Sequence, residues 1–311
     1  MKKFILKTLL LIFPIVVLAV SMEYLLRQIP NDYAYKKNYL DKNAEKIEVL
    51  ILGGSHTYNG VNPSYFSQNA FNASHGSQSW KFDYEIFKKY KDDFNNLKII
   101  ILNVSVRSLW YKMENSEEPW RKAKYVIYYK IGSNTFSLRE NTEFFSSKFF
   151  TNIERLFKNY CIERIDLKLK YGLGYAKHIG TSSLQAIHGR HVINIISSKK
   201  NVMIFEENLE ILNLFSEFCN QHNVKLIFLT TPAYHTYREN LPPEQINKMI
   251  ETINTFVEKH PNSYYLNWFE NSDFVADDFY NADHLNDIGA EKLSKKLANY
   301  IDSLELYQSL Y

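Results

Sequence analysis

Short apolar runs alternate with amphipathic stretches along most of the chain. Continuous apolar runs of about four to eight residues are typical of strands buried on both faces, and apolar residues three or four apart are typical of helices. The predicted strands are 48–52, 70–73, 98–104, 224–230 and 264–267. The predicted helices are 80–94, 206–222, 243–259 and 287–306. This alternation predicts an α/β fold in three layers, α/β/α, around a parallel five-stranded sheet.

The first 30 residues show a different pattern, a single long apolar run. Three lysines within the first seven residues precede an apolar stretch from Thr8 to Leu26. About 20 apolar residues can cross a bilayer as a helix, and flanking lysines favour the cytoplasmic side. We therefore predict a single-pass anchor at 1–30 in the inner (cytoplasmic) membrane, with the rest of the chain extracytoplasmic. A cleavable signal peptide is the competing interpretation, because Ala19-Val20-Ser21 offers the small residues of a cleavage site.

Two further segments depart from the alternation of strands and helices. Residues 31–46 are polar and rich in Tyr, Lys and Asn, and we predict that they form a linker. The remaining domain, 47–311, contains an aromatic-rich stretch at about 107–203 without clear alternation. We interpret this stretch as an insertion over the rim of the sheet, with helices at 146–160 and 162–171.

Composition limits the classes of partner and cofactor. The 311 residues are 45% hydrophobic, enough for one large core, and the net charge is only +3. Basic and acidic residues are interleaved, so we expect no nucleic-acid partner. Cys161 and Cys219 lie far apart and match neither a zinc-ligand set nor a CxxC pair. Two free thiols are favoured over a disulfide, and no metal site is predicted.

Two segments about 230 residues apart carry the candidate chemistry. The first predicted strand breaks at Gly53-Gly54 and is followed by Ser55, and His284 stands just before the last predicted helix. A serine hydroxyl is a weak nucleophile unless a base takes its proton, and a histidine is the usual base. We expect the two residues to meet at the carboxyl ends of the strands. The competing interpretations are a helix N-cap for Ser55 and a capping or surface role for His284.

The segments LGGSHTYNGVNP and DHLNDIGAEKLS resemble the SGNH/GDSL hydrolase superfamily. They look most similar to its membrane-anchored, extracytoplasmic branch, which includes proteins of teichoic acid D-alanylation and polysaccharide O-acetylation. The resemblance covers most of 48–301. It implies a flavodoxin-like sheet, Ser55 as nucleophile and His284 as base.

The acidic member of the catalytic triad departs from the pattern of this superfamily. The superfamily commonly has Asp three residues before the histidine, where this chain has Asn281. Asp283 is the nearest carboxylate in sequence and Asp278 the next. The alternatives are therefore a triad completed by one of these carboxylates and a Ser-His dyad oriented by Asn281.

The resemblance also implies an oxyanion hole made of three donors. One is the backbone amide of Ser55. The second is a backbone amide from the segment 72–78, for which Ser74 and Gly76 are the candidates. The third is a donor at the end of the 98–104 strand, either the Asn103 side chain or Ser105.

Three residues near these blocks are candidate substrate contacts. His56 follows the nucleophile, and Arg107 and Trp110 begin the insertion, where they suit glycan binding and stacking. Local hydrogen bonding by His56, a solvated turn at Arg107 and a core position for Trp110 are the competing interpretations.

These features together predict a membrane-anchored serine esterase or O-acyltransferase that acts on acyl esters of cell-envelope glycans through an acyl-Ser55 intermediate. Its expected partners are an acylated carbohydrate, the membrane and a membrane-bound acyl donor protein, and no cofactor is implied. The alternative is a catalytically impaired protein of this fold that binds or assembles envelope polysaccharide, since Asn281 replaces the usual acid.

Overall fold

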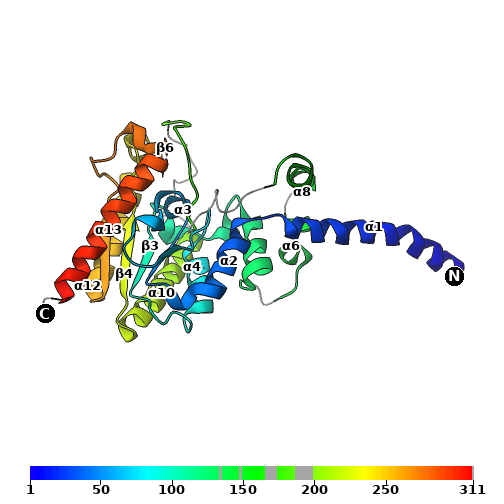
Figure 1. Ribbon diagram of the computed structural model, residues 1–311, viewed down its shortest axis with the longest axis horizontal. Helices are drawn as coiled ribbons and strands as arrows, with labels where there is room; N and C mark the ends of the chain where they lie inside the picture. The colour runs from blue at the N-terminus through cyan, green and yellow to red at the C-terminus, as the bar shows by residue number, and fades with distance from the viewer. Residues whose placement is uncertain (133–134, 147–148, 165–173, 186–198, 310–311) are drawn as a thin grey trace. The chain divides into compact units, whose positions relative to one another are not determined.

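The computed structural model describes the chain except for residues 133–134, 147–148, 165–173, 186–198 and 310–311. The described residues group into two compact units (Figure 1). One unit comprises Met1–Lys37 and Glu117–Leu167, and the other comprises Asn38–Ser116 and Lys168–Tyr311. The predicted extent of the insertion, 107–203, and its position over the rim stay predictions.

The larger unit is built on a five-stranded parallel sheet, as predicted. The strands are β1 (Val49–Leu52), β2 (Ala70–Asn72), β3 (Ile99–Asn103), β4 (Lys225–Thr230) and β5 (Ser263–Asn267), in the order β2-β1-β3-β4-β5. Leu52 pairs with Leu102, and Leu102 pairs with Phe228. This order is that of flavodoxin-like folds, in which ligands bind at the carboxyl ends of the strands.

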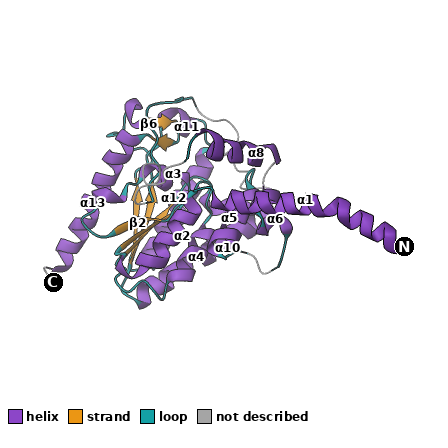
Figure 2. Cartoon of the chain, turned by 45° about the vertical axis from the view of Figure 1, so that its right-hand side comes forward, coloured by secondary structure: helices purple, strands orange, loops and turns teal. Residues whose placement is uncertain are grey.

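Helices cover both faces of this sheet (Figures 1 and 2). They are α3 (Ser55–Gly60), α4 (Trp80–Tyr90), α10 (Lys199–Gln221), α12 (Pro243–Lys259) and α13 (Asp287–Ser309). Aromatic contacts join α4 to α10, with the Phe87 and Phe215 rings 5.2 Å apart, and α12 to the sheet through Phe256 and Phe228. The three-layer α/β/α prediction is confirmed.

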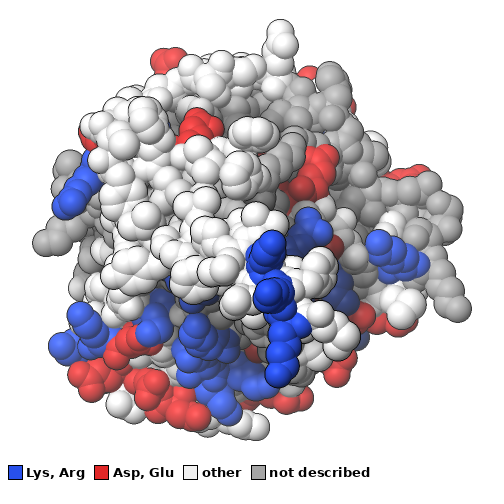
Figure 3. All heavy atoms as spheres, turned by 90° about the vertical axis from the view of Figure 1, so that its right-hand side faces the viewer, with Lys and Arg blue, Asp and Glu red and all other residues white. Residues whose placement is uncertain are grey.

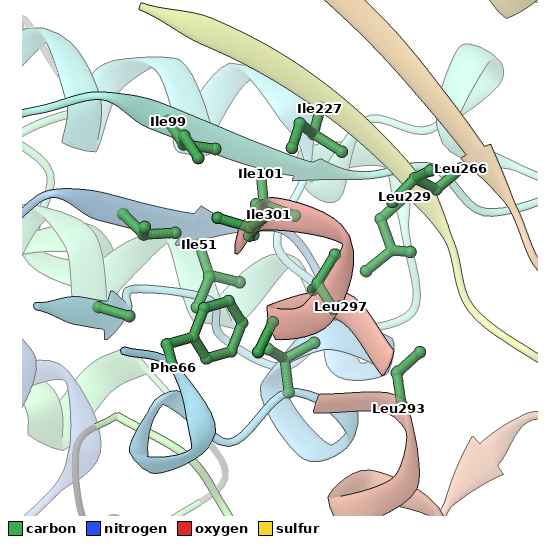
Figure 4. Packing of buried hydrophobic residues seen from close by; sticks show 14 of the residues in the cluster. Ile51, Phe66, Ile99, Ile101, Ile227, Leu229, Leu266, Leu293, Leu297 and Ile301 are labelled. Carbon is green, nitrogen blue, oxygen red and sulfur yellow. The ribbon is translucent and has the colours of Figure 1, made fainter. Parts of the chain in front are cut away.

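One face of the sheet packs against α13. Side chains that alternate along β1, β3 and β4 point to this helix, as the period of two of a strand requires (Figure 4). Ile51, Ile101 and Leu297 are completely buried there. Full burial of each such side chain contributes about 1.5–3 kcal/mol, so α13 holds the C-terminal end of the chain firmly under the sheet.

A short hairpin precedes α13 and was not predicted. Its strands are β6 (Phe279–Asn281) and β7 (His284–Leu285), paired antiparallel. After the end of β4, α11 (His235–Glu239) begins next to this hairpin, where the Tyr234 backbone N–H donates to the carbonyl of Ala282. Both elements bring side chains to the carboxyl edge of the sheet.

The smaller unit contains the apolar helix α1 (Lys2–Gln28), which is long and apolar enough to cross a membrane. The predicted linker 31–46 contains the helix α2 (Asp32–Asn43) and a 3-10 turn (Ala44–Lys46). Of these residues, 31–37 belong to the smaller unit and 38–46 to the larger one. The other elements of the smaller unit are the 3-10 turn η5 (Pro119–Arg121), α5 (Lys122–Lys124), the π-helix η6 (Tyr125–Tyr129), α6 (Leu138–Asn141), α7 (Glu143–Ser146), α8 (Phe149–Phe157) and the π-helix η7 (Lys158–Ile162). The predicted helix 146–160 thus overlaps α8 and η7. The predicted helix 162–171 lies mostly outside the described residues.

Candidate active site

The turn between β1 and α3 places Ser55 at the rim of the sheet. Gly53 has φ +134°, and a Cβ there would lie 2.3 Å from the Cβ of Asn103. Only glycine therefore suits this position. Gly54 is the N-cap of α3 and Ser55 its first residue. The competing interpretation of Ser55 as an N-cap is wrong, and its hydroxyl is available to another partner.

That partner is His284, which the β6–β7 hairpin presents. Its Nε2 lies 2.7 Å from Ser55 Oγ. Its Nδ1 lies 3.0 Å from both Asn281 Oδ1 and Asp283 Oδ1. Because both neighbours of Nδ1 are oxygen acceptors, the proton of a neutral imidazole belongs on Nδ1. Nε2 is then free to accept the hydrogen bond from the serine hydroxyl, as a general base must.

Asn281 and Asp283 support the histidine in different ways. Asn281 Oδ1 also accepts hydrogen bonds from the backbone N–H groups of Asp283 and His284, at 3.2 and 2.9 Å. It therefore fixes the turn that carries the imidazole. Asp283 supplies a buried charge, with 2% of its surface exposed. Burial opposes its ionisation, but the charge of His284 and hydrogen bonds from His284 and His56 hold the pKa of Asp283 well below its usual range.

The third candidate acid, Asp278, serves a different part of the structure. Its Oδ2 accepts a hydrogen bond from the backbone N–H of Val275 and pairs with Lys292 Nζ on α13 at 2.7 Å. Asp278 thus anchors the turn before the hairpin. Of the two carboxylates considered, the structure brings Asp283 to the imidazole.

The ring of His56 lies next to the ring of His284. Its ring stacks on the His284 ring with a centroid distance of 4.9 Å and an interplanar angle of 8°. Its Nε2 is 3.7 Å from Asp283 Oδ2. Burial lowers the pKa of His56, and the charge of His284 lowers it further despite the nearby carboxylate. A neutral His56 therefore flanks the base.

His56, Asp283 and His284 also meet the geometric condition for a metal site, with one ligand atom of each within 4.8 Å of the others. The hydrogen bonds already account for both nitrogens of His284. We therefore interpret the cluster as a hydrogen-bonded Ser-His-Asp arrangement with a second histidine beside it.

Of the two candidates for the second oxyanion donor, Ser74 already makes hydrogen bonds within its own loop. The Ser74 amide donates to Asn72 Oδ1 at 3.0 Å, and its buried hydroxyl pairs with Thr57 Oγ1. Ser74 therefore stabilises the loop after β2. Gly76, a partly exposed turn residue, remains the candidate for the second donor, in addition to the Ser55 amide.

Both candidates for the third oxyanion donor, Asn103 and Ser105, already make hydrogen bonds within the protein. Asn103 is buried, and its Nδ2 donates to the carbonyl of Leu229 at 3.2 Å. The Ser105 amide donates to Ser108 Oγ, and the hydroxyls of the two serines lie 2.9 Å apart. The assignment of the third donor to Asn103 or Ser105 stays a prediction.

A small pocket opens beside His56, lined by residues at and just after the ends of β3 and β4. Ser105, Thr231, Tyr237 and Phe269 are among its lining residues. Tyr237 is a site residue that the sequence did not reveal. Burial and the charge of Asp283 raise the pKa of this tyrosine, so its hydroxyl stays protonated. Its position on α11, directly after β4, was the only available signal.

The two remaining substrate-contact candidates lie in different surroundings. Trp110 is 6% exposed and packs against Phe205, with ring centroids 5.9 Å apart. It is a core residue, and the prediction that it stacks on glycan is wrong. The Arg107 guanidinium lies 4.0 Å from the centroid of the Tyr111 ring. Its charge acts on both His56 and Tyr237, so it belongs to the surroundings of the pocket.

Comparison with known proteins finds similarity only among solved structures. No protein-family profile matches the chain, and no curated protein does. A matching solved structure is that of a candidate acylhydrolase from Bacteroides fragilis. The identity is 12% and the TM-score 0.39, over 88% of this chain and 99% of that one. At this level of similarity the description of that protein does not extend to the present chain.

Proposed function

We propose that this protein is a membrane-anchored SGNH-type serine esterase or O-acyltransferase that acts on acyl esters of cell-envelope glycans. The observation that carries the proposal is the 2.7 Å contact between Ser55 Oγ and His284 Nε2, with Asp283 at Nδ1 of the same ring. This is the arrangement that activates a serine hydroxyl for attack on an ester.

The chemistry follows from these three side chains. Ser55 Oγ attacks the ester carbonyl carbon while its proton passes to His284 Nε2. The negative charge of Asp283 stabilises the imidazolium that forms. When the ester C–O bond breaks, His284 gives this proton to the departing alkoxide oxygen, and the acyl group remains on Ser55.

The second half of the reaction reverses these proton transfers. A hydroxyl of a sugar or of water gives its proton to His284 Nε2 and attacks the acyl carbon. The bond to Ser55 Oγ breaks, and Ser55 regains the proton. The backbone amides of Ser55 and Gly76 are the proposed donors to the oxyanion in both halves. Exclusion of water would favour transfer over hydrolysis.

The substrate class rests on two supports. The first is the resemblance of the segments around Ser55 and His284 to the membrane-anchored branch of the superfamily. The second is α1, whose length and apolar composition suit a span that would hold the site at the outer membrane surface. Arg107, beside the pocket, is a suitable contact for a polar or anionic group of the substrate.

Labelling with a fluorophosphonate probe tests the proposal on the full-length protein. We expect wild-type protein to react, Ser55→Ala to give no labelling, and His284→Ala to react much more slowly. Ser64→Ala is a matched control, because this exposed serine lies outside the site. Turnover of an acetylated carbohydrate should fall by several orders of magnitude in Ser55→Ala.

Two results would count against an active serine. One is labelling of folded wild-type protein no stronger than that of Ser55→Ala. The other is unchanged turnover in Ser55→Ala. The first result would favour the alternative, a protein that binds or assembles polysaccharide without catalysis.

A further inference from the structure

Helix α8, with the η7 turn that follows it, turns polar side chains toward the protein. Asn152 is completely buried, and its Nδ2 donates to the carbonyls of Glu143 and Phe144. Arg155 NH1 donates to Glu143 Oε2 at 3.0 Å. One turn further along, Asn159 is 6% exposed. Residues three or four apart share a helix face, so the inward face of this segment is polar.

The same segment exposes its apolar side chains. Phe150 is 82% exposed and Phe157 60% exposed. Other exposed apolar residues of the segment and its neighbours in the smaller unit are Phe136, Leu138, Phe145, Phe149, Ile153, Tyr160 and Ile162. At helical spacing, one apolar stripe contains residues 149, 150, 153, 157 and 160. The edge of this stripe that lies away from the inward polar face carries the exposed polar residues Thr151, Glu154 and Lys158. Figure 3 shows one face of the molecule, on which uncharged residues form a broad area.

This arrangement reverses that of a helix on a water-soluble protein, where the apolar stripe faces the core. A rotation that buried the phenylalanines would pull Asn152 and Arg155 away from Glu143. Glu143 is itself completely buried and also binds Lys124 Nζ and Tyr128 Oη. Its charge therefore depends on these partners, and they fix the orientation of the helix. An exposed apolar stripe of this kind needs an apolar environment outside the protein.

Contacts with α1 indicate what that environment is. The Glu23 carboxylate accepts hydrogen bonds from the backbone N–H groups of Glu143 and Phe144, at 3.1 and 2.8 Å. Tyr160 Oη donates to the carbonyl of Leu25 at 3.0 Å. Hydrogen bonds thus tie α7 and the η7 turn after α8 to the last two turns of α1.

The length of α1 sets the level of these turns. Its apolar stretch runs from Thr8 to Leu26, after Lys2, Lys3 and Lys7, and about 20 helical residues cross the roughly 30 Å hydrocarbon core of a bilayer. Glu23 and Leu25 then lie in the last turns of the span, next to the far boundary of the bilayer, where tyrosine is favoured and charged residues first become tolerated. The apolar stripe lies at the same level.

We propose that the 149–160 segment is a lipid-binding surface, with its apolar stripe inserted into the outer interface of the bilayer that α1 spans. The ligand is the acyl-chain and headgroup boundary of that leaflet, about 5–10 Å deep, as for other interfacial amphipathic helices. The inference rests on the proposed membrane span of α1 and is independent of the proposed chemistry. It would hold the smaller unit against the membrane at two places instead of one.

Site-directed fluorescence quenching in nanodiscs tests the proposal on the full-length chain. A Cys161→Ser background removes the exposed thiol, and Cys219 is buried. Single labels are placed through Phe150→Cys and Phe157→Cys on the stripe, and through Thr151→Cys on the polar edge as the matched control. The discs contain phosphatidylcholine and phosphatidylglycerol, with a nitroxide on the lipid or iodide in the water as quencher.

We expect lipid nitroxides to quench the 150 and 157 labels several-fold more than the 151 label, and iodide to show the opposite order. Iodide quenching of the 150 and 157 labels at the level of the 151 label would overturn the proposal. Protection of both from both quenchers would also overturn it and indicate a protein partner or a second copy.

A fourth label, at Leu10→Cys on α1, separates this proposal from the anchor itself. Lipid quenching at 10 with aqueous exposure at 150 and 157 would leave the anchor intact and refute only the lipid-binding surface. Aqueous exposure at 10 would refute the span, and the lipid-binding surface with it.

Discussion

At the scale of single residues, His284 Nδ1 has two oxygen neighbours with different tasks. Asn281 organises the hairpin through three hydrogen bonds, and Asp283 carries the charge. Asparagine at the position of the usual acid is therefore compatible with a working base, because the carboxylate approaches from two residues further along.

Asp283→Asn should lower the rate of ester turnover by up to about four orders of magnitude, because the imidazolium loses its charge partner and its tautomer is no longer fixed. The measurement is kcat on an acetylated substrate, with the exposed neighbour Asp277→Asn as the matched control. Full activity in Asp283→Asn would mean that Asn281 alone orients the histidine. In that case Asn281→Asp should raise the rate.

A second buried carboxyl, Asp83, contacts the β1–α3 turn through the Gly53 backbone. Burial raises its pKa from 3.8 to about 7, although hydrogen bonds from Gln78 and the Gly53 backbone oppose the shift. The folded state therefore holds this proton across a range, about pH 4 to 7, in which the unfolded state has lost it. Stability should fall as pH rises through that range, by up to about 1.4 kcal/mol per pH unit.

Asp83→Asn removes this titration and keeps a neutral side chain of the same shape. Its stability relative to wild type should increase from pH 5 to pH 7 and change little above that. Thermal unfolding of the detergent-solubilised protein at several pH values measures this, with the exposed Asp92→Asn as control. Parallel pH profiles for wild type and Asp83→Asn would show that Asp83 does not titrate in this range.

At the scale of elements, the β1–α3 turn determines whether Ser55 reaches the rim. Gly53→Ala should destabilise the protein by at least about 1–3 kcal/mol, because the φ of +134° is strained for any side chain and the new Cβ meets Asn103. Gly54→Ala is the matched control, since its Cβ would meet only the Gln78 carbonyl at 3.5 Å. Equal melting temperatures for the two variants would contradict this account of the turn.

At the scale of the whole molecule, α1 is long and apolar enough to cross a membrane. The full-length protein should fractionate with membranes, and protease added from the outer side should cleave beyond Arg27, because the N-terminal lysines favour a cytoplasmic end. Immunoblots of spheroplast fractions measure both. A soluble mature form beginning at Met22 would show instead that the signal-peptide interpretation is right.

The sequence alone determined the sheet, its covering helices, the apolar α1, and Ser55 and His284 as partners. These follow from local periodicity and from residue types next to strand ends, which are properties of short segments.

Only the tertiary structure decided the choice among Asn281, Asp283 and Asp278, because adjacent side chains diverge and a hairpin turn sets their directions. It also showed that Trp110 is a core residue and that Tyr237 and Asp83 lie beside the site. The polar inward face of α8 likewise depends on Glu143 and α1, which contact it from other parts of the chain. Such contacts join segments far apart in sequence, and no local pattern records them.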